Sequence, residues 1–218
     1  ELCYITLGDT KLLAEVIKVK GRYASVQVFE STRGLKNGDA VEFEGRMLEV
    51  TLGPGLMSSV YDGLQNNLAT MEGVFLKRGE YTMPLDHDRL WDFTPIAKAG
   101  DKVIAADWLG EVKEGWLPHK IMVPFSCTGE YTVKSVAEAG QYNIDHTVAV
   151  LTDAEGEDVN VTMVQKWPAK VAIKNYVEKP RPNRIMETGV RVIDTLNPIA
   201  EGGTGFIPGP FGCGKTVL

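Results

Sequence analysis

Short runs of alternating apolar and polar residues, separated by turns, make up the first part of the chain. The turns contain Gly21, Gly38 and Gly45, and alternation between such turns is the pattern of β-hairpins. The expected strands are residues 12–19, 23–29, 40–43 and 47–52. We therefore expect the N-terminal residues 1–66 to form a small antiparallel β-barrel.

The middle of the chain has a different composition from Met71 onward. It contains all four tryptophans and no stripe of apolar residues with a helical period. We expect a short helix over residues 60–68 to lead into it, followed by several strands. These strands are expected near residues 102–104, 119–123, 129–136 and 147–151.

A weak internal repeat relates residues 99–103 to residues 138–144, and in each copy a glycine precedes a hydrophobic strand. The repeat resembles the biotinyl/lipoyl barrel-sandwich fold, in which two similar halves meet at a hairpin. We therefore expect residues 67–178 to form a β-rich domain with a barrel-sandwich-like core. Lys120 lies between the halves, where a carrier lysine would lie, but it follows His119 rather than methionine. The likeness therefore concerns the fold, and a carrier function is an alternative.

Two prolines stiffen the chain after this domain, in Lys179-Pro180-Arg181-Pro182-Asn183. Each proline fixes its own φ and restricts the residue before it, so we expect a domain boundary there. Thr188 is the expected N-cap of a short helix over residues 189–196, which Asn197-Pro198 ends. Residues 204–207 are expected to form a short buried strand.

The composition is that of a globular protein, with 44% hydrophobic and 24% charged residues. A formal net charge of −6 argues against nucleic acid as a partner, because binding to its backbone needs a basic face. The three cysteines are an odd number at wide spacing, which favours a reducing compartment over a disulfide framework. The histidines are scattered, without the spacing of metal ligands, and are expected to be surface or capping residues.

The strongest chemical signal is a glycine-rich loop near the end of the sequence. It matches the pattern G-x-x-x-x-G-K-[S/T] in Gly209-Pro210-Phe211-Gly212-Cys213-Gly214-Lys215-Thr216. A polyphosphate carries dense negative charge, so a protein surrounds it with backbone N–H groups, and glycines let the backbone approach closely. The strand expected directly before the loop is the context that supports this motif.

The motif assigns roles to its residues. Lys215 would neutralise charge on the transferred phosphoryl group, and Thr216 would place its hydroxyl on Mg²⁺. Phe211 is expected to shape the loop. Cys213 is either a redox-sensitive thiol whose oxidation blocks phosphate or a small tolerated residue. The expected nucleotide-binding residues are Gly209, Pro210, Phe211, Gly212, Cys213, Gly214, Lys215, Thr216 and Val217.

Together with this loop, Thr188-Gly189-Val190-Arg191-Val192-Ile193-Asp194-Thr195-Leu196 resembles the catalytic A subunit, called alpha in some naming, of V-type and archaeal-type rotary ATPases. The resemblance extends along nearly the whole chain. Residues 28–35 and 52–56 are similar to the N-terminal barrel of that family. The extra bulge domain, which the non-catalytic B subunit and the F-type subunits lack, is similar to residues 91–95, 119–124 and 166–168.

The resemblance implies a subunit that binds ATP or ADP with Mg²⁺ and couples ATP hydrolysis or synthesis to the movement of H⁺ or Na⁺. It implies B subunits as partners in an alternating A3B3 ring, with a central stalk inside the ring and a peripheral stalk that contacts the bulge. The implied location is cytoplasmic, in the head of the ATPase, with no nucleic-acid partner. Contact with the membrane would be indirect, through the ion-translocating sector.

Compared with the family, the chain lacks the first barrel strand and everything after Leu218, including the catalytic glutamate. We therefore expect residues 179–218 to be the truncated start of an α/β nucleotide-binding domain, and the chain alone to be inactive. One alternative is a non-catalytic binding or carrier module that uses the barrel-sandwich. Another is a structural bulge, for which exposure of Trp108 and Trp116 would indicate an interface rather than a packed core.

Overall fold

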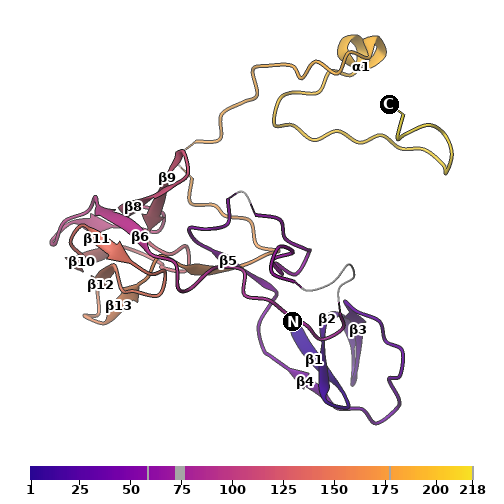
Figure 1. The fold of residues 1–218 in the computed structure, drawn as a ribbon, viewed down its shortest axis with the longest axis horizontal. Helices are drawn as coiled ribbons and strands as arrows, with labels where there is room; N and C mark the ends of the chain where they lie inside the picture. Colours follow the sequence, from indigo (N-terminus) through magenta and orange to yellow (C-terminus); the bar gives the residue numbers. More distant parts are fainter. Residues whose placement is uncertain (58, 72–76, 177, 218) are drawn as a thin grey trace. The chain divides into compact units, whose positions relative to one another are not determined.

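The computed structural model describes residues 1–57, 59–71, 77–176 and 178–217. The chain divides into two compact units, Glu1–Asn175 and Tyr176–Leu218, which are drawn from indigo to yellow along the sequence in Figure 1. In the described residues, nearly all regular structure is β-strand and one short helix lies in the second unit. The prediction of a mainly β fold is therefore confirmed.

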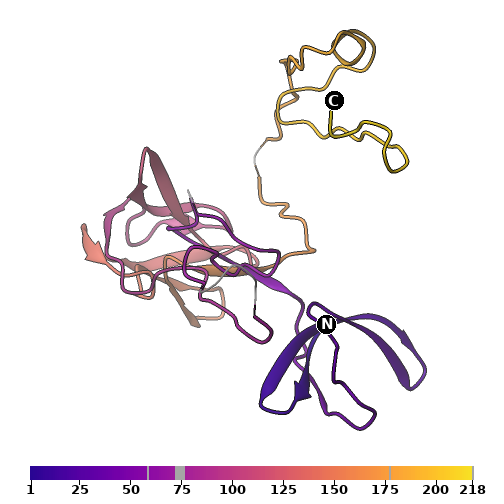
Figure 2. The same cartoon turned by 45° about the vertical axis from the view of Figure 1, so that its right-hand side comes forward.

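The first unit begins with an antiparallel sheet in the order β3-β2-β1-β4, drawn in indigo in Figure 2. Cys3, Ile5 and Ala14 form its buried centre. The predicted hairpin before residue 30 is confirmed, whereas the first strand was missed by the sequence analysis. The strands are β1 (Leu2–Leu7), β2 (Thr10–Lys20), β3 (Tyr23–Val28) and β4 (Val41–Phe43).

A two-stranded sheet joins early and late parts of this unit, because β5 (Glu49–Leu52) pairs with β14 (Gln165–Pro168). The other edge of β5 is covered by the Gln65 side chain. Its amide accepts a hydrogen bond from the N–H of Thr51 and donates one to the carbonyl of the same residue, both at 2.7 Å. An unpaired strand edge is thereby protected by a side chain.

The helix expected over residues 60–68 is wrong, because this segment forms turns. The Asp62 carboxylate accepts hydrogen bonds from the N–H groups of Leu64 and Asn66, at 2.9 and 2.8 Å. An aspartate that bonds nearby backbone in this way offers the chain an alternative to a helix. Gln65 also has φ 65°, outside the right-handed helical region.

The middle of the first unit contains two further sheets, in the orders β11-β6-β8-β9 and β13-β12-β10-β7. Five of these strands confirm predicted ones, β11 among them as the strand expected in the second copy of the repeat, although β6, β8 and β13 were missed. The strands are β6 (Trp91–Pro95), β7 (Lys102–Val103), β8 (Trp108–Glu114), β9 (Leu117–Met122), β10 (Tyr131–Val136), β11 (Gly140–Tyr142), β12 (Ala149–Thr152) and β13 (Asp158–Val161).

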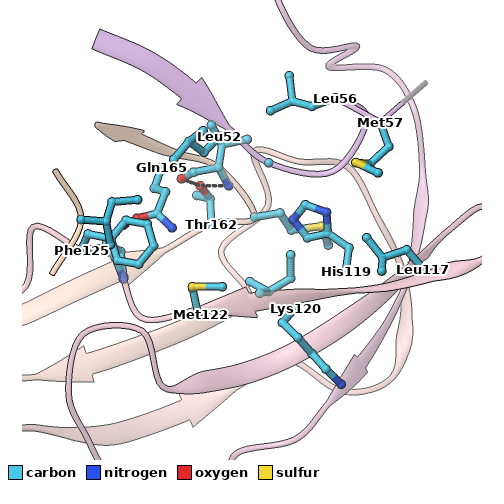
Figure 3. Close-up of a pocket in the computed structure, with 16 residues that line it drawn as sticks. Leu52, Leu56, Met57, Leu117, His119, Lys120, Met122, Phe125, Thr162 and Gln165 are labelled. Atoms are coloured by element: carbon cyan, nitrogen blue, oxygen red, sulfur yellow. Dashed lines mark hydrogen bonds between the residues drawn. The ribbon is translucent and has the colours of Figure 1, made fainter. Parts of the chain in front are cut away.

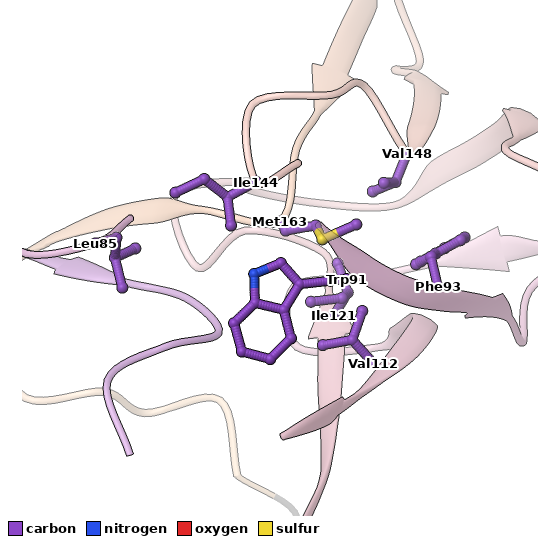
Figure 4. Packing of buried hydrophobic residues seen from close by; sticks show 8 residues of the cluster. All are labelled: Leu85, Trp91, Phe93, Val112, Ile121, Ile144, Val148 and Met163. Atoms are coloured by element: carbon purple, nitrogen blue, oxygen red, sulfur yellow. The ribbon is translucent and has the colours of Figure 1, made fainter. Parts of the chain in front are cut away.

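Two hydrophobic clusters lie in this region, and β8 contributes to both. The first cluster surrounds Trp91 and Phe93, as Figure 4 shows, and the second surrounds Leu109 and Leu151. Gly110 permits the tightest contact of the first cluster, since a Cβ there would lie 2.3 Å from the Phe93 ring. The core of this unit therefore depends on one glycine in β8 as well as on large apolar side chains.

Candidate phosphate-binding site

The glycine-rich loop lies in the second unit, which begins its regular structure with α1 (Arg191–Leu196). Its helical N-cap is Val190, not the predicted Thr188, and a valine side chain cannot cap. Asp194 replaces that interaction by reaching backward. Its carboxylate accepts hydrogen bonds from the Thr188 hydroxyl at 2.6 Å, the Thr188 N–H at 3.1 Å and the Gly189 N–H at 3.0 Å. The short helix is confirmed, with a later start and a different cap.

The hydrogen bond from the Thr188 hydroxyl, reinforced by the two backbone N–H groups, holds the pKa of Asp194 below its usual value. A carboxylate that accepts several hydrogen bonds is stabilised in its charged form. This role of Asp194 was not predicted from the sequence. The signal available in the sequence was the spacing: an aspartate follows, six residues later, the threonine that precedes the helix.

The strand expected at residues 204–207 is not formed in the described part of the chain. Phe206 and Ile207 are 86% and 48% exposed. The backbone bridge recorded in this unit joins Ile185 to Ala200, and residues 204–207 have no strand beside them in the described residues. A strand needs a hydrogen-bonded neighbour and an apolar surface to cover its side chains, so the apolar pattern alone was insufficient.

The loop itself adopts turns whose backbone requires its glycines. Gly212 and Gly214 have φ values of 81° and 83°, in the left-handed region that glycine enters without steric cost. Gly209 approaches Cys213 so closely that a Cβ would lie 2.4 Å from the Cys213 Sγ. Backbone geometry thus explains the two fixed glycines of the motif, Gly209 and Gly214, and also the glycine at position 212.

Lys215 folds back onto its own loop and donates a hydrogen bond from Nζ to the Gly209 carbonyl at 2.6 Å. The whole predicted set, Gly209 to Val217, is exposed. Within the described residues, no group of three or more His, Cys, Asp or Glu side chains is placed to hold a metal ion, so Thr216 has no carboxylate partner of that kind there. Of the predicted binding residues, Lys215 and Gly209 are thus brought together by a hydrogen bond.

The donors of this loop nevertheless fit an anion. Among the described residues, no acceptor is recorded for the backbone N–H groups of Gly212, Gly214, Lys215 and Thr216. Free backbone N–H groups together with one ammonium are the donors that a polyphosphate needs. Lys215 would have to leave the Gly209 carbonyl to add its charge.

A second polar arrangement, which the sequence analysis missed, lies in the first unit. Glu114 is buried, and one of its carboxylate oxygens accepts hydrogen bonds from the N–H groups of Gly55 and Met57 at 2.7 and 3.0 Å. The other oxygen lies 2.7 Å from His119 Nδ1. Because a carboxylate can only accept, Nδ1 carries the proton. The signal available in the sequence was an acidic residue placed five positions before a histidine.

His119 borders a cavity of about 380 Å³, which is mostly apolar and is drawn in Figure 3. Lys120 also lines it, but its ammonium is paired with Glu111 and lies 4.8 Å from the centre of the Trp108 ring. Lys120 therefore lies within a strand and is engaged by two neighbours. A carrier lysine has to be available at a turn, so this placement disfavours the carrier alternative.

The exposure of the tryptophans separates two remaining interpretations of this domain. Trp91 is 3% exposed, whereas Trp108 and Trp116 are 55% and 86% exposed. Trp116 lies in the two-residue turn that joins β8 to β9. Large exposed aromatic side chains are typical of interaction surfaces, so these two residues favour an interface.

Comparisons with known proteins agree with the folds of both parts of the first unit. Residues 1–45 match the ATP synthase alpha/beta family, beta-barrel domain. Residues 82–170 match the ATPsynthase alpha/beta subunit barrel-sandwich domain. The predictions of an N-terminal barrel and of a barrel-sandwich-like domain are thereby confirmed.

The whole chain is also similar to curated relatives. It is 49% identical to the V-type ATP synthase alpha chain of Treponema denticola. It is 48% identical to the proteins of that name from Chlamydia caviae and from Borrelia garinii subsp. bavariensis. The chain spans 38% of the length of the Treponema denticola and Borrelia relatives and 37% of the Chlamydia relative. Helices long and apolar enough to cross a membrane are absent from the described residues.

Proposed function

Because the chain belongs to the family of V-type ATP synthase alpha chains, we propose that it is part of the catalytic, ATP-binding subunit of a rotary ATPase. The complete subunit would couple ATP hydrolysis or synthesis to the transport of protons or sodium ions. The observation that carries this proposal is the similarity over the whole chain, combined with a phosphate-binding motif whose glycines have the backbone geometry described above.

In this proposal the loop from Gly209 to Val217 binds the phosphates of ATP or ADP. Backbone N–H groups surround the phosphate oxygens, and Lys215 neutralises the charge that develops on the transferred group. The Thr216 hydroxyl would be a ligand of Mg²⁺, which supplies further neutralisation of phosphate charge when bound. The close contact of Gly209 with Cys213 supports a compact loop at this position.

We also propose that the 218-residue chain by itself neither hydrolyses ATP nor binds it tightly. Phosphate sites of this type draw much of their affinity from the N-terminus of a following helix. In the described residues, positions 209–217 form turns and no helix. Lys215 is moreover held by the Gly209 carbonyl.

The expected assembly follows from the same proposal. The complete subunit would alternate with B subunits in an A3B3 ring around a central stalk, in the cytoplasmic head of the ATPase. The barrel-sandwich domain would contact the peripheral stalk, and the exposed Trp108 and Trp116 are the residues that support such a contact. We keep domain limits at residues 1–66, 67–178 and 179–218 as part of the proposal.

A chimaera tests the function directly. The region of the Treponema denticola alpha chain that aligns with this chain is replaced by the 218 residues, and the chimaera is assembled with the B subunit and central stalk of that organism. We expect Mg²⁺-dependent ATP hydrolysis. Lys215→Ala should lower its rate by roughly 100-fold or more, because a charge-stabilising group is lost.

The control is Lys120→Ala, which removes a lysine far from the loop in sequence. Its ATPase rate should stay close to that of the unmodified chimaera. An assembled chimaera without ATPase activity, or one in which Lys215→Ala has no effect, would refute the proposed function. For the 218-residue chain alone, a micromolar affinity for Mg-ATP in calorimetry would refute the proposed inactivity.

A further inference from the structure

Strand β9 (Leu117–Met122) is an edge strand, since among the described residues it pairs only with β8. Val123 directly follows this strand, and its two backbone hydrogen bonds show which backbone groups of β9 point toward β8. Val123 donates to the Asp107 carbonyl at 2.9 Å and accepts from the Ala106 N–H at 3.0 Å. Because backbone groups alternate along an antiparallel strand, the N–H and C=O groups of Lys120 and Met122 point away from β8.

Pro118 lies two residues before Lys120, so its backbone points to the same side of the strand as those of Lys120 and Met122. Proline has no N–H to donate, so it is tolerated where a strand faces outward and would interrupt a ladder elsewhere. Its presence is therefore consistent with the assigned direction. We call the outward backbone groups of Pro118, Lys120 and Met122 the β9 edge. This edge offers two donors and three acceptors to another strand.

The cavity of about 380 Å³ is lined on one side by β9. Its opposite wall is formed by Leu52, Leu56 and Met57 and by residues 162–165, and Figure 3 shows Met57 and Leu56 on the side opposite Met122. Most of the lining side chains are apolar. Methionine side chains such as Met57 and Met122 adapt to different apolar partners. The edge and the cavity together match the arrangement of strand-addition sites, where backbone bonds hold a segment and pockets take its alternate side chains.

The charge of the cavity restricts the partner further. His119 and Lys120 are the titratable residues among those that line it. Each is already paired within the chain, His119 with the buried Glu114 and Lys120 with Glu111. A charged partner would gain no ion pair and would lose its hydration, which is costly. The complementary partner is therefore an uncharged segment.

We propose that the β9 edge binds an extended, uncharged and predominantly apolar segment of a partner polypeptide, which adds to the sheet as a strand. This interaction is independent of the nucleotide-binding function proposed above. A second copy of this chain suits the edge less well. Antiparallel pairing of β9 with itself would place Lys120 opposite its equivalent, and Pro118 would leave one acceptor opposite it without a donor.

The test uses the 218-residue chain and a short, end-blocked fluorescent peptide that alternates valine and threonine, a composition that favours extended structure. We expect saturable binding by fluorescence polarisation. Hydrogen exchange should show new protection of the Lys120 and Met122 amides on addition of peptide. The same peptide with proline at its centre should not bind.

Two variants form a matched pair. Lys120→Pro removes one outward N–H and should weaken binding about tenfold, the effect of one lost backbone hydrogen bond. Lys120→Ala keeps that N–H and shows the effect of losing the side chain alone, so Lys120→Pro should bind about tenfold more weakly than Lys120→Ala. The hydrogen-exchange result on the unmodified chain stands even where Lys120→Pro fails to fold.

Each other outcome overturns the proposal. Equal binding by Lys120→Pro and Lys120→Ala, or peptide binding without protection of the two amides, excludes strand addition. Protection that appears with increasing protein concentration in the absence of peptide, together with dimers in sedimentation, assigns the edge to a second copy. Binding of the proline-containing peptide with equal affinity assigns the cavity to apolar ligands without defined backbone structure.

Discussion

The two units of this protein differ in how they treat apolar side chains. In the described residues, the buried hydrophobic side chains all lie in Glu1–Asn175. In the described residues of the second unit most large apolar side chains are exposed, including Phe206 at 86% and Phe211 at 106%. Among the described residues, the unit with the clearest chemical motif therefore has no buried apolar side chains, whereas the unit with the cores has no such motif.

This difference shows that a motif and a packed structure are specified separately. The glycines of the loop establish its turns through local φ preferences, without any buried contact. The sheets of the first unit require pairing between distant segments, as when β5 meets β14. Four predictions test the comparison, from the largest expected effect to the smallest.

The first prediction compares one phenylalanine from each unit. Phe93→Ala should lower the free energy of unfolding by about 3–5 kcal/mol, because a fully buried ring in a tight cluster is lost. Phe206→Ala removes an exposed ring and should change it by less than about 0.5 kcal/mol. Urea denaturation followed by circular dichroism, which reports on both units, measures both. Similar effects of the two substitutions would abolish the distinction between the units.

The second prediction concerns the buried carboxylate of the first unit. Glu114→Ala leaves His119 and the N–H groups of Gly55 and Met57 without their acceptor, and should cost about 3 kcal/mol of unfolding free energy. Glu114→Gln keeps a carbonyl oxygen for the backbone donors and should cost clearly less. Equal losses for the two variants would show that the backbone hydrogen bonds contribute little.

The third prediction concerns the contact between Tyr81 and the N-terminal sheet. The Tyr81 hydroxyl donates to Glu30 and accepts from the Leu13 N–H at 3.1 Å, so Tyr81→Phe should cost about 1 kcal/mol. Burial, reinforced by the hydrogen bond to Glu30, raises the pKa of Tyr81 above its usual value near 10. This contribution is fully present below pH 10 and is lost as pH rises through the higher folded pKa.

The measurement for Tyr81 is unfolding free energy against pH between neutrality and pH 11. The unmodified chain should lose stability above pH 10 more steeply than Tyr81→Phe, because the phenylalanine variant lacks the titrating group. Parallel curves for the two proteins would contradict the assigned cause.

The fourth prediction is confined to the second unit and has the smallest effect on overall stability. Asp194 has a lowered folded pKa, so its contribution to the α1 cap is present above the unfolded value of 3.8 and is lost as pH falls through the folded pKa. The NMR amide signals of Thr188 and Gly189 should shift in that acidic range. Asp194→Asn should remove the shift, while the core amides of Phe93 and Val112 should not follow it in either protein.

Sequence reasoning succeeded where the determining interactions are local. Alternation with glycine turns located the β2–β3 hairpin, and the short helix before the loop was placed within two residues of its observed start. It failed over residues 60–68, where the apolar spacing suggested a helix. There Asp62 bonds the nearby backbone and Gln65 bonds Thr51 of β5, so one local interaction and one with a strand more than ten residues away decided the outcome.

The sequence by itself therefore determined the β character of the protein and the glycine-dependent turns of residues 209–216, because these follow from preferences of single residues and their neighbours. Tertiary structure decided which apolar runs became strands. Residues 131–136 found hydrogen-bonding neighbours and a core, while residues 204–207 found neither in the described part of the chain. The physical reason is that a strand is stabilised by pairing and burial, which depend on neighbouring segments and not on the apolar run itself.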